Sequence, residues 1–100
     1  MESTLDLGPV SLDDKLTLAD NQLGLPPGYS KAQAHIESSL DNTKINPASG
    51  AAGLFQIMPQ NVSTYSKRVG RKLDPHNDDD ALYMRNELLK ENLKYFKTLD

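Results

Sequence analysis

The sequence contains no cysteine in its 100 residues. The missing thiols exclude disulfide bonds, thiolate metal ligands and a cysteine nucleophile, although they do not identify a cellular compartment. Hydrophobic residues are also few: they make up 37% of the chain, and the mean hydropathy is −0.59. A chain of this length and composition forms one small domain, or part of one, with a modest core.

Excess positive charge and long apolar runs are missing as well. The net charge is −3 and the sequence pI is near 5.2, so we expect no nucleic-acid partner and no binding to anionic lipid. No apolar run approaches the roughly 18 residues that a membrane span needs, so we expect no membrane span. The opening residues, MESTLDLGPV, lack the basic and then apolar segments of a secretory signal.

Apolar spacing and helix-capping residues predict two helices in the first half of the chain. Residues 1–10 are expected to form a tail, closed by Gly8 and Pro9. The first helix is predicted to begin at Ser11 or Asp13 and to end at about Leu23. The second is predicted from about Pro27 or Ser30 to Ser39, with its apolar side formed by Tyr29, Ala32, Ile36 and Leu40.

Two more helices are predicted in the second half, after a polar loop at 41–53. Pro59 suits the first turn of a third helix, which we expect to end at Arg68 or Val69. The acidic run Asp78–Asp80 suits the start of a last helix. No alternating strand pattern is present, so we predict an all-α domain at 11–100.

Glu37 is the strongest candidate for a catalytic acid. It lies at the predicted end of the second helix, in the segment AHIESSLD, with Ile36 and Leu40 nearby. Partial burial without a cationic partner favours the protonated carboxyl that a general acid requires. Taken alone, however, a glutamate at a helix end is more often a solvated residue than a catalytic one.

Three segments in order give Glu37 its context: IESSLD, INPASGAAGLFQIMP and LDPHND. The second segment contains the pair Asn46-Pro47, and from Ser49 onward it is uncharged and glycine-rich. Together the segments resemble the catalytic domain of the soluble lytic transglycosylases, which are relatives of goose-type lysozyme. The lead-in GLPPG also matches that family, and the resemblance covers roughly Leu18 to Leu99. It implies a small lysozyme-like helical domain, truncated at its C-terminal end.

The resemblance also assigns roles to site residues. It implies that Glu37 is catalytic and that Gln56 and Met58 contact the saccharide, Gln56 through its amide and Met58 through an adaptable apolar side chain. It implies that Ser38 hydrogen-bonds the Glu37 carboxyl. It further implies that Gly53 lets the backbone approach the sugar without a β-carbon in the way.

The implied enzyme is a peptidoglycan lytic transglycosylase that cleaves the β-1,4 bond between N-acetylmuramic acid and N-acetylglucosamine. Glu37 protonates the glycosidic oxygen and then takes the proton of the muramoyl C6 hydroxyl, which closes on C1 to give a 1,6-anhydro product. This scheme needs one protein carboxylate, whereas most glycosidases use two. A lysozyme-like hydrolase stays open as an alternative, with Asp41 or an acid of the Asp74–Asp80 segment positioning water.

Metal ligands are not indicated by the sequence. His35 and His76 are far apart, and no ligand pair has helical spacing. We therefore expect no metal and no other cofactor, and the expected substrate is the glycan strand of peptidoglycan.

The sequence departs from the family pattern in two places. Phe55 stands where the family usually has Met, and for Phe55 and Ile57 we favour plain core packing. An Ala-Tyr-Asn-Ala-Gly-type motif, which supplies a Tyr and an Asn to the family's site, is missing before Asp100. We expect either a longer natural protein or an incomplete groove, with a strip around Leu89, Leu93 and Phe96 covered by a continuation or by another subunit. An inactive or weakly active virion structural or peptidoglycan-binding module with the same fold is the alternative.

The expected setting is a phage virion. The acidic start and the early position of the domain resemble phage virion-associated transglycosylases, which open peptidoglycan locally during genome entry. We therefore expect other virion proteins as partners and action in the host periplasm. A bacterial periplasmic or envelope enzyme is the alternative.

Overall fold

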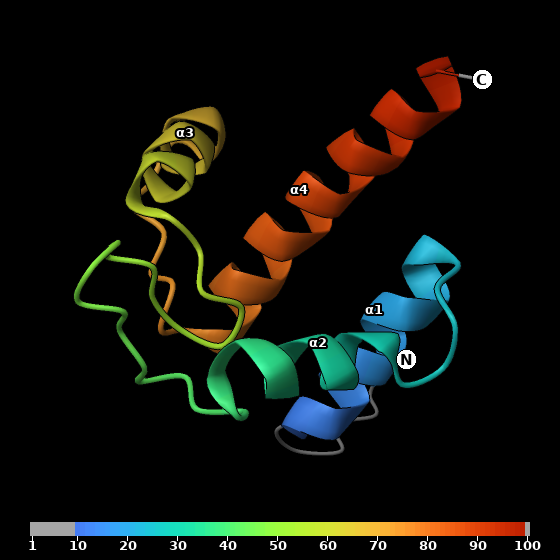
Figure 1. Cartoon of the computed structure of the whole chain (residues 1–100), viewed down its shortest axis with the longest axis horizontal. Helices are drawn as coiled ribbons and strands as arrows, with labels where there is room; N and C mark the ends of the chain where they lie inside the picture. Colours follow the sequence, from blue (N-terminus) through green and yellow to red (C-terminus); the bar gives the residue numbers. More distant parts are fainter. Residues whose placement is uncertain (1–9, 100) are drawn as a thin grey trace, which may run out of the picture.

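The computed structural model describes residues 10–99, with side chains described as far as residue 92. This part of the chain forms four helices: α1 (Leu12–Leu23), α2 (Tyr29–Ser38), α3 (Pro59–Val69) and α4 (Asp78–Leu99) (Figure 1). Strand pairing within it is limited to isolated bridges of Ala52 with Ile45 and with Ile57. The predicted all-α class is confirmed. The division into a tail and a domain stays a prediction, since residues 1–9 lie outside the described range.

Local residues explain where the helices begin. The Ser11 hydroxyl accepts a hydrogen bond from the Asp14 backbone N–H at 3.1 Å, which caps α1. Pro59 occupies the first turn of α3, where its missing N–H costs nothing. The Asn77 side chain accepts from the Asp80 N–H at 3.0 Å at the start of α4. These start signals were all readable from the sequence.

The long helix α4 organises the packing. It packs against both α1 and α3, and α1 also packs against α2. In Figure 1 the last turns of α4 extend beyond the other helices, while the chain between α2 and α3 forms a long loop beside the start of α4. The core draws on all four helices and on this loop; its buried members are Leu16, Ala19, Ala34, Leu54, Phe55, Ile57, Tyr65, Leu73, Ala81, Leu82 and Met84.

The predicted apolar side of α2 is wrong for three of its four residues. Tyr29, Ala32 and Ile36 are exposed, and Ile36 is 82% exposed. The buried side is made of small residues instead, at Ser30, Ala34 and Ser38. Small side chains let the helix approach its neighbours closely, and the two hydroxyls bond to buried polar groups there.

A buried polar network fixes the start of α2. Asp20 accepts hydrogen bonds from the N–H of Gly28 and of Ser30, both at 3.0 Å, and from the Ser30 hydroxyl at 2.6 Å. Arg85 of α4 then donates to the same hydroxyl through Nη2 at 2.6 Å. Burial lowers the pKa of the Arg85 guanidinium, and the Asp20 carboxylate opposes that shift. The network therefore ties α1, α2 and α4 together with two charges of opposite sign.

Candidate active site

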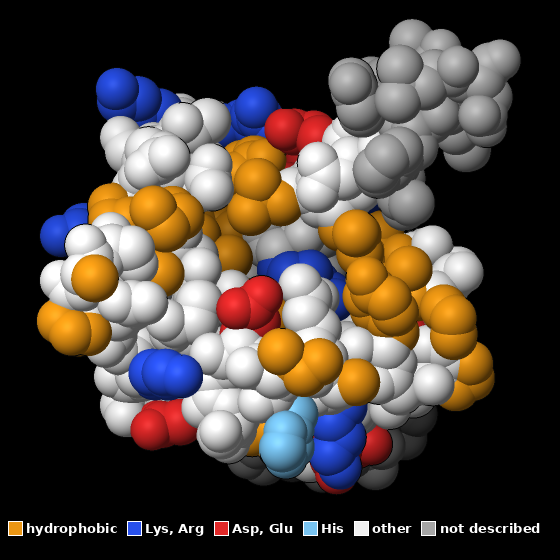
Figure 2. All heavy atoms as spheres, in the orientation of Figure 1, with side chains coloured by type: hydrophobic (Ala, Val, Ile, Leu, Met, Phe, Trp, Pro, Cys, Tyr) orange, Lys and Arg blue, Asp and Glu red, His pale blue; other side chains and the backbone are white. Residues whose placement is uncertain are grey.

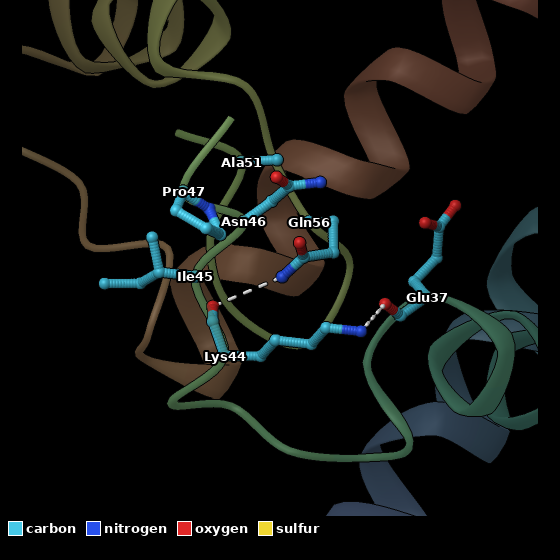
Figure 3. Close-up of a pocket in the computed structure, with 7 residues that line it drawn as sticks. All are labelled: Glu37, Lys44, Ile45, Asn46, Pro47, Ala51 and Gln56. Atoms are coloured by element: carbon cyan, nitrogen blue, oxygen red, sulfur yellow. Dashed lines mark hydrogen bonds between the residues drawn. The ribbon is translucent and has the colours of Figure 1, made fainter. Parts of the chain in front are cut away.

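A hollow of about 500 Å³ lies between the end of α2 and the long loop that follows it. We call it the Glu37 hollow; it is lined by Glu37, Lys44, Ile45, Asn46, Pro47, Ala51 and Gln56 (Figure 3). The space-filling view shows a face hollowed near its centre, where acidic and basic side chains lie between hydrophobic ones (Figure 2). Polar groups and apolar walls in one open hollow suit a saccharide better than a flat surface would.

Glu37 stands at the rim of this hollow. It belongs to the last turn of α2, and its side chain is exposed, not partly buried as the sequence had suggested. The Lys44 ammonium donates to the backbone carbonyl of Glu37 at 3.3 Å, while the carboxyl group points away from Lys44 (Figure 3). Among the side chains described to residue 92, none forms a salt bridge with the carboxyl group. It is thus available to a ligand.

Ser38 does not hold the Glu37 carboxyl in this structure, which corrects the expected contact. Ser38 is 1% exposed, and its hydroxyl oxygen lies within hydrogen-bond distance of two carbonyl oxygens, of Leu54 at 2.8 Å and of Ala34 at 3.1 Å, to which its O–H can donate. The same oxygen accepts from the Asp41 N–H at 3.2 Å. Ser38 therefore joins the end of α2 to the glycine-rich loop and to the turn at Asp41.

Gln56 presents its amide to the hollow in one defined orientation. Its Nε2 donates to the carbonyl oxygens of Gly53, at 2.9 Å, and Lys44, at 3.2 Å. A side-chain amide has two N–H donors, so both are used and the oxygen is left to accept from a ligand. The backbone of Gln56 adopts a φ of 52°, a left-handed conformation that these two bonds stabilise.

The sequence match with known families agrees with this geometry. A model of the Transglycosylase SLT domain matches residues 17–99. The chain belongs to the transglycosylase SLT domain family. Membership implies peptidoglycan as the substrate of this domain. No curated protein and no solved structure gives a significant match to the chain.

Gly53 of this SLT domain contacts protein where a sugar contact was expected. It is buried with a φ of +82°, and a β-carbon on it would lie 1.8 Å from the Pro75 carbonyl oxygen. The residue is therefore needed for a close backbone approach, as predicted, but the partner is the segment before α4. Its assignment as a substrate-binding residue stays a prediction.

Met58 lies in a neighbouring hollow of about 230 Å³. We call this space the Arg85 groove; its lining includes Gln33, Gln56, Met58, Arg85, Leu88 and Leu89. Gln56 lines both hollows, so the two share one wall. A saccharide contact of Met58 stays a prediction, and the expected core positions of Phe55 and Ile57 are confirmed at 4% exposure each.

The other candidate acids, Asp41 and the Asp74–Asp80 segment, do not line the Glu37 hollow. Among the described side chains, Glu37 is the only acid that lines its hollow. Asp41 instead accepts from the Thr43 hydroxyl at 2.6 Å and from the Thr43 N–H at 2.9 Å, and these bonds lower the pKa of the Asp41 carboxyl. Asp80 is buried against Arg71. The arrangement therefore offers one carboxyl group to a ligand.

Sequence reasoning missed several residues of the site. Lys44, Gln33 and Arg85 had no motif to mark them. Lys44 lines the Glu37 hollow, whereas Arg85 donates to Gln33 at 2.9 Å in the neighbouring hollow. Asn46 was noted as part of the loop, where its Oδ1 accepts from the Ala48 N–H at 2.9 Å and shapes the turn. No cluster of three His, Cys, Asp or Glu side chains suitable for a metal occurs in the part of the chain described. None of its helices is long and apolar enough to cross a membrane.

Proposed function

We propose that the protein is a lytic transglycosylase that cleaves the bond between N-acetylmuramic acid and N-acetylglucosamine with Glu37 as its single acid and base. One observation carries the proposal: Glu37 is the only carboxyl group among the described residues that line the hollow. Two-carboxylate glycosidases need a second acid about 5–10 Å from the first, on the other side of the scissile bond. Asp41, the nearest acid in sequence, is engaged with Thr43.

The proposed reaction balances without water. The Glu37 carboxyl gives its proton to the glycosidic oxygen as the bond to C1 of the muramoyl sugar breaks. The resulting carboxylate takes the proton of the C6 hydroxyl, and the C6 oxygen bonds to C1. The products are a free N-acetylglucosamine end and a 1,6-anhydro-muramoyl end, and Glu37 is again protonated.

Exposure of Glu37 fits an open groove that a glycan strand completes. A bound sugar removes water from the carboxyl group and strengthens its interactions with the reacting atoms. Gln56 and the loop from Lys44 to Ala51 form the opposite side of the hollow. They supply carbonyl and amide groups across the hollow from the acid.

Mass spectrometry of digested peptidoglycan sacculi tests the reaction type. We expect muropeptides with 1,6-anhydro ends, lighter by one water than the products of a lysozyme. Products with reducing ends would favour the hydrolase alternative, and Asp41 would then be the first acid to replace. Binding of sacculi without any release would favour the peptidoglycan-binding module.

Action from a phage virion during genome entry, in the host periplasm and beside other virion proteins, is part of this proposal. It rests on the sequence resemblance alone. Detection of the protein in purified particles by peptide mass spectrometry would support it, and detection only in a bacterial envelope fraction would contradict it.

A further inference from the structure

The segment that leads into α4, residues 74–78, is attached to the long loop that follows α2. Nδ1 of His76 lies 2.7 Å from the carbonyl oxygen of Asn42. The side-chain amide of Asn42 in turn donates to Oδ1 of Asp78 at 3.2 Å. Asn42 is therefore bound to this segment through its backbone and through its side chain.

The contact with Asn42 defines where the His76 ring carries its proton. A carbonyl oxygen only accepts hydrogen bonds, so Nδ1 of His76 must be the protonated nitrogen that donates. In the neutral ring, Nε2 is then unprotonated. The backbone of His76 is anchored as well, because its N–H donates to Oδ1 of Asp74 at 2.9 Å. His76 is therefore a donor that is held within its own turn.

A closed turn connects Asn42 to the wall of the Glu37 hollow. Asp41 accepts the N–H and the hydroxyl of Thr43 through its side chain, and its carbonyl oxygen accepts the Lys44 N–H at 3.3 Å. Asn42 lies inside this turn, so a displacement of its carbonyl group also displaces Lys44.

Lys44 is the residue at which the two sides of the loop meet. Its carbonyl oxygen accepts the Gly53 N–H at 2.8 Å and Nε2 of Gln56 at 3.2 Å, and both Lys44 and Gln56 line the Glu37 hollow. This wall lies across the hollow from Glu37 (Figure 3). Gly53 also packs closely on the Pro75 backbone, so the segment before α4 supports the wall at two points.

We propose that His76 is a positioning residue for the cleavage reaction. Its hydrogen bond to Asn42 holds the wall that carries Gln56 at a fixed place across the hollow from Glu37. His76 is not among the residues that line this hollow, so it acts on the substrate only through the loop. For its effect on rate the inference rests on the proposed function, whereas its effect on the loop is measured without a substrate.

Two substitutions at His76 separate the hydrogen bond from the rest of the ring. His76→Asn keeps the donor, because the side-chain nitrogen of asparagine takes the place of Nδ1. His76→Leu has the same branched shape without a donor. The matched control is His35→Leu, the same change at an exposed histidine of α2. All variants are made in the whole chain, and a melting curve of each identifies any that fail to fold.

NMR of the folded protein measures the effect on the loop. We expect the neutral His76 ring of the wild type to carry its proton on Nδ1. In His76→Leu the signals of the Gly53 N–H and of the Gln56 side-chain amide should move toward those of solvated amides, and in His76→Asn and His35→Leu they should stay near the wild-type positions. Loss of the imidazole itself affects the asparagine and leucine variants alike, so their difference reports the hydrogen bond.

Release of soluble muropeptides from sacculi measures the effect on rate, at a temperature where all variants are folded. His76→Leu should slow release by roughly ten- to a hundredfold, because a displacement of the substrate by about 1 Å costs that much. His76→Asn should restore most of the rate, and His35→Leu should leave it unchanged.

A neutral ring protonated on Nε2, unmoved loop signals in folded His76→Leu, or equal effects of the leucine and asparagine variants would each overturn the inference. Moved signals with an unchanged release rate would overturn it as well. Wild-type protein that releases nothing contradicts the proposed function instead, and the NMR comparison then decides by itself whether His76 holds the loop.

Discussion

A β-carbon on Gly53 would lie 1.8 Å from the carbonyl oxygen of Pro75. The glycine-rich loop therefore contacts the segment before α4 backbone to backbone. Because Gly53 also donates its N–H to the Lys44 carbonyl oxygen at 2.8 Å, this residue connects the Lys44 side of the Glu37 hollow to the segment before α4. The shape of the hollow depends on this contact.

Gly53→Ala should destabilise the protein by about 2–4 kcal/mol. The added methyl group must displace the Pro75 backbone, and the alanine must adopt a left-handed φ. Gly70→Ala is the matched control. It has a similar φ of +79°, but nothing lies within 4 Å of the added carbon, so only the backbone strain of about 1 kcal/mol is expected. Urea unfolding followed by circular dichroism measures both. Equal losses would mean that the Pro75 contact adds nothing.

The helices and most of their ends were predictable because the signals are local. Ser11, Pro59 and Gly70 act within one turn of their own position. The buried side of α2 was not predictable in this way, because hydrophobicity pointed to Ile36 while the structure buries Ser30 and Ser38. Their burial depends on partners in other elements, Asp20 and the Leu54 carbonyl.

The residues of the candidate site also fall into two groups, those that a local sequence pattern predicts and those that it does not. The Glu37 and Gln56 positions followed from a motif within one stretch of chain, and the structure places both on one hollow. The pairing of Gln33 with Arg85 spans 52 positions and has no local pattern. The need for a glycine at position 53 was recognised, but its contact with Pro75 was not, because a left-handed glycine does not indicate what approaches it.

Ser38→Ala should lower stability more than it affects the chemistry of Glu37. The change leaves the Asp41 N–H and the Leu54 carbonyl without their buried partner, at a cost of about 1–3 kcal/mol. Ser63→Ala, on the exposed side of α3, should be nearly neutral. Thermal unfolding measures both, and activity below the melting transition checks the site. A fully stable Ser38→Ala protein with a shifted pH–activity profile would instead support a direct contact with Glu37.

Asp80 should contribute a pH-dependent part of the stability. Hydrogen bonds from Arg71 and from the Asp74 N–H hold the pKa of the Asp80 carboxyl below its ordinary 3.8. A carboxyl with a lowered folded-state pKa stabilises the fold above its unfolded value, and the contribution is lost as the pH falls through the lowered one. The free energy of unfolding should therefore drop from about pH 4 downward.

Asp80→Asn should remove much of that acid-side slope and cost about 1–3 kcal/mol at neutral pH. The neighbouring Asp79→Asn is the control, because Asp79 is exposed and pairs only with Lys15, at 2.9 Å, among the described side chains. Urea unfolding at a series of pH values gives both results. An unchanged slope in Asp80→Asn would assign the acid sensitivity to other carboxyl groups.

Glu37→Gln should abolish cleavage of sacculi while leaving the fold intact. The substitution keeps the shape of an exposed side chain that forms no salt bridge within the described residues, so the melting temperature should change little. Loss of a positioned acid and base typically costs roughly 10²–10⁴-fold in rate.

Asp41→Asn tests the two-carboxylate alternative. If Glu37 is the single working carboxyl group, the Asp41→Asn protein should keep most of its activity, because Asp41 only shapes the turn at Thr43. Release of soluble muropeptides measures both variants, and loss of activity in Asp41→Asn with a stable fold would require a second carboxyl group in the reaction.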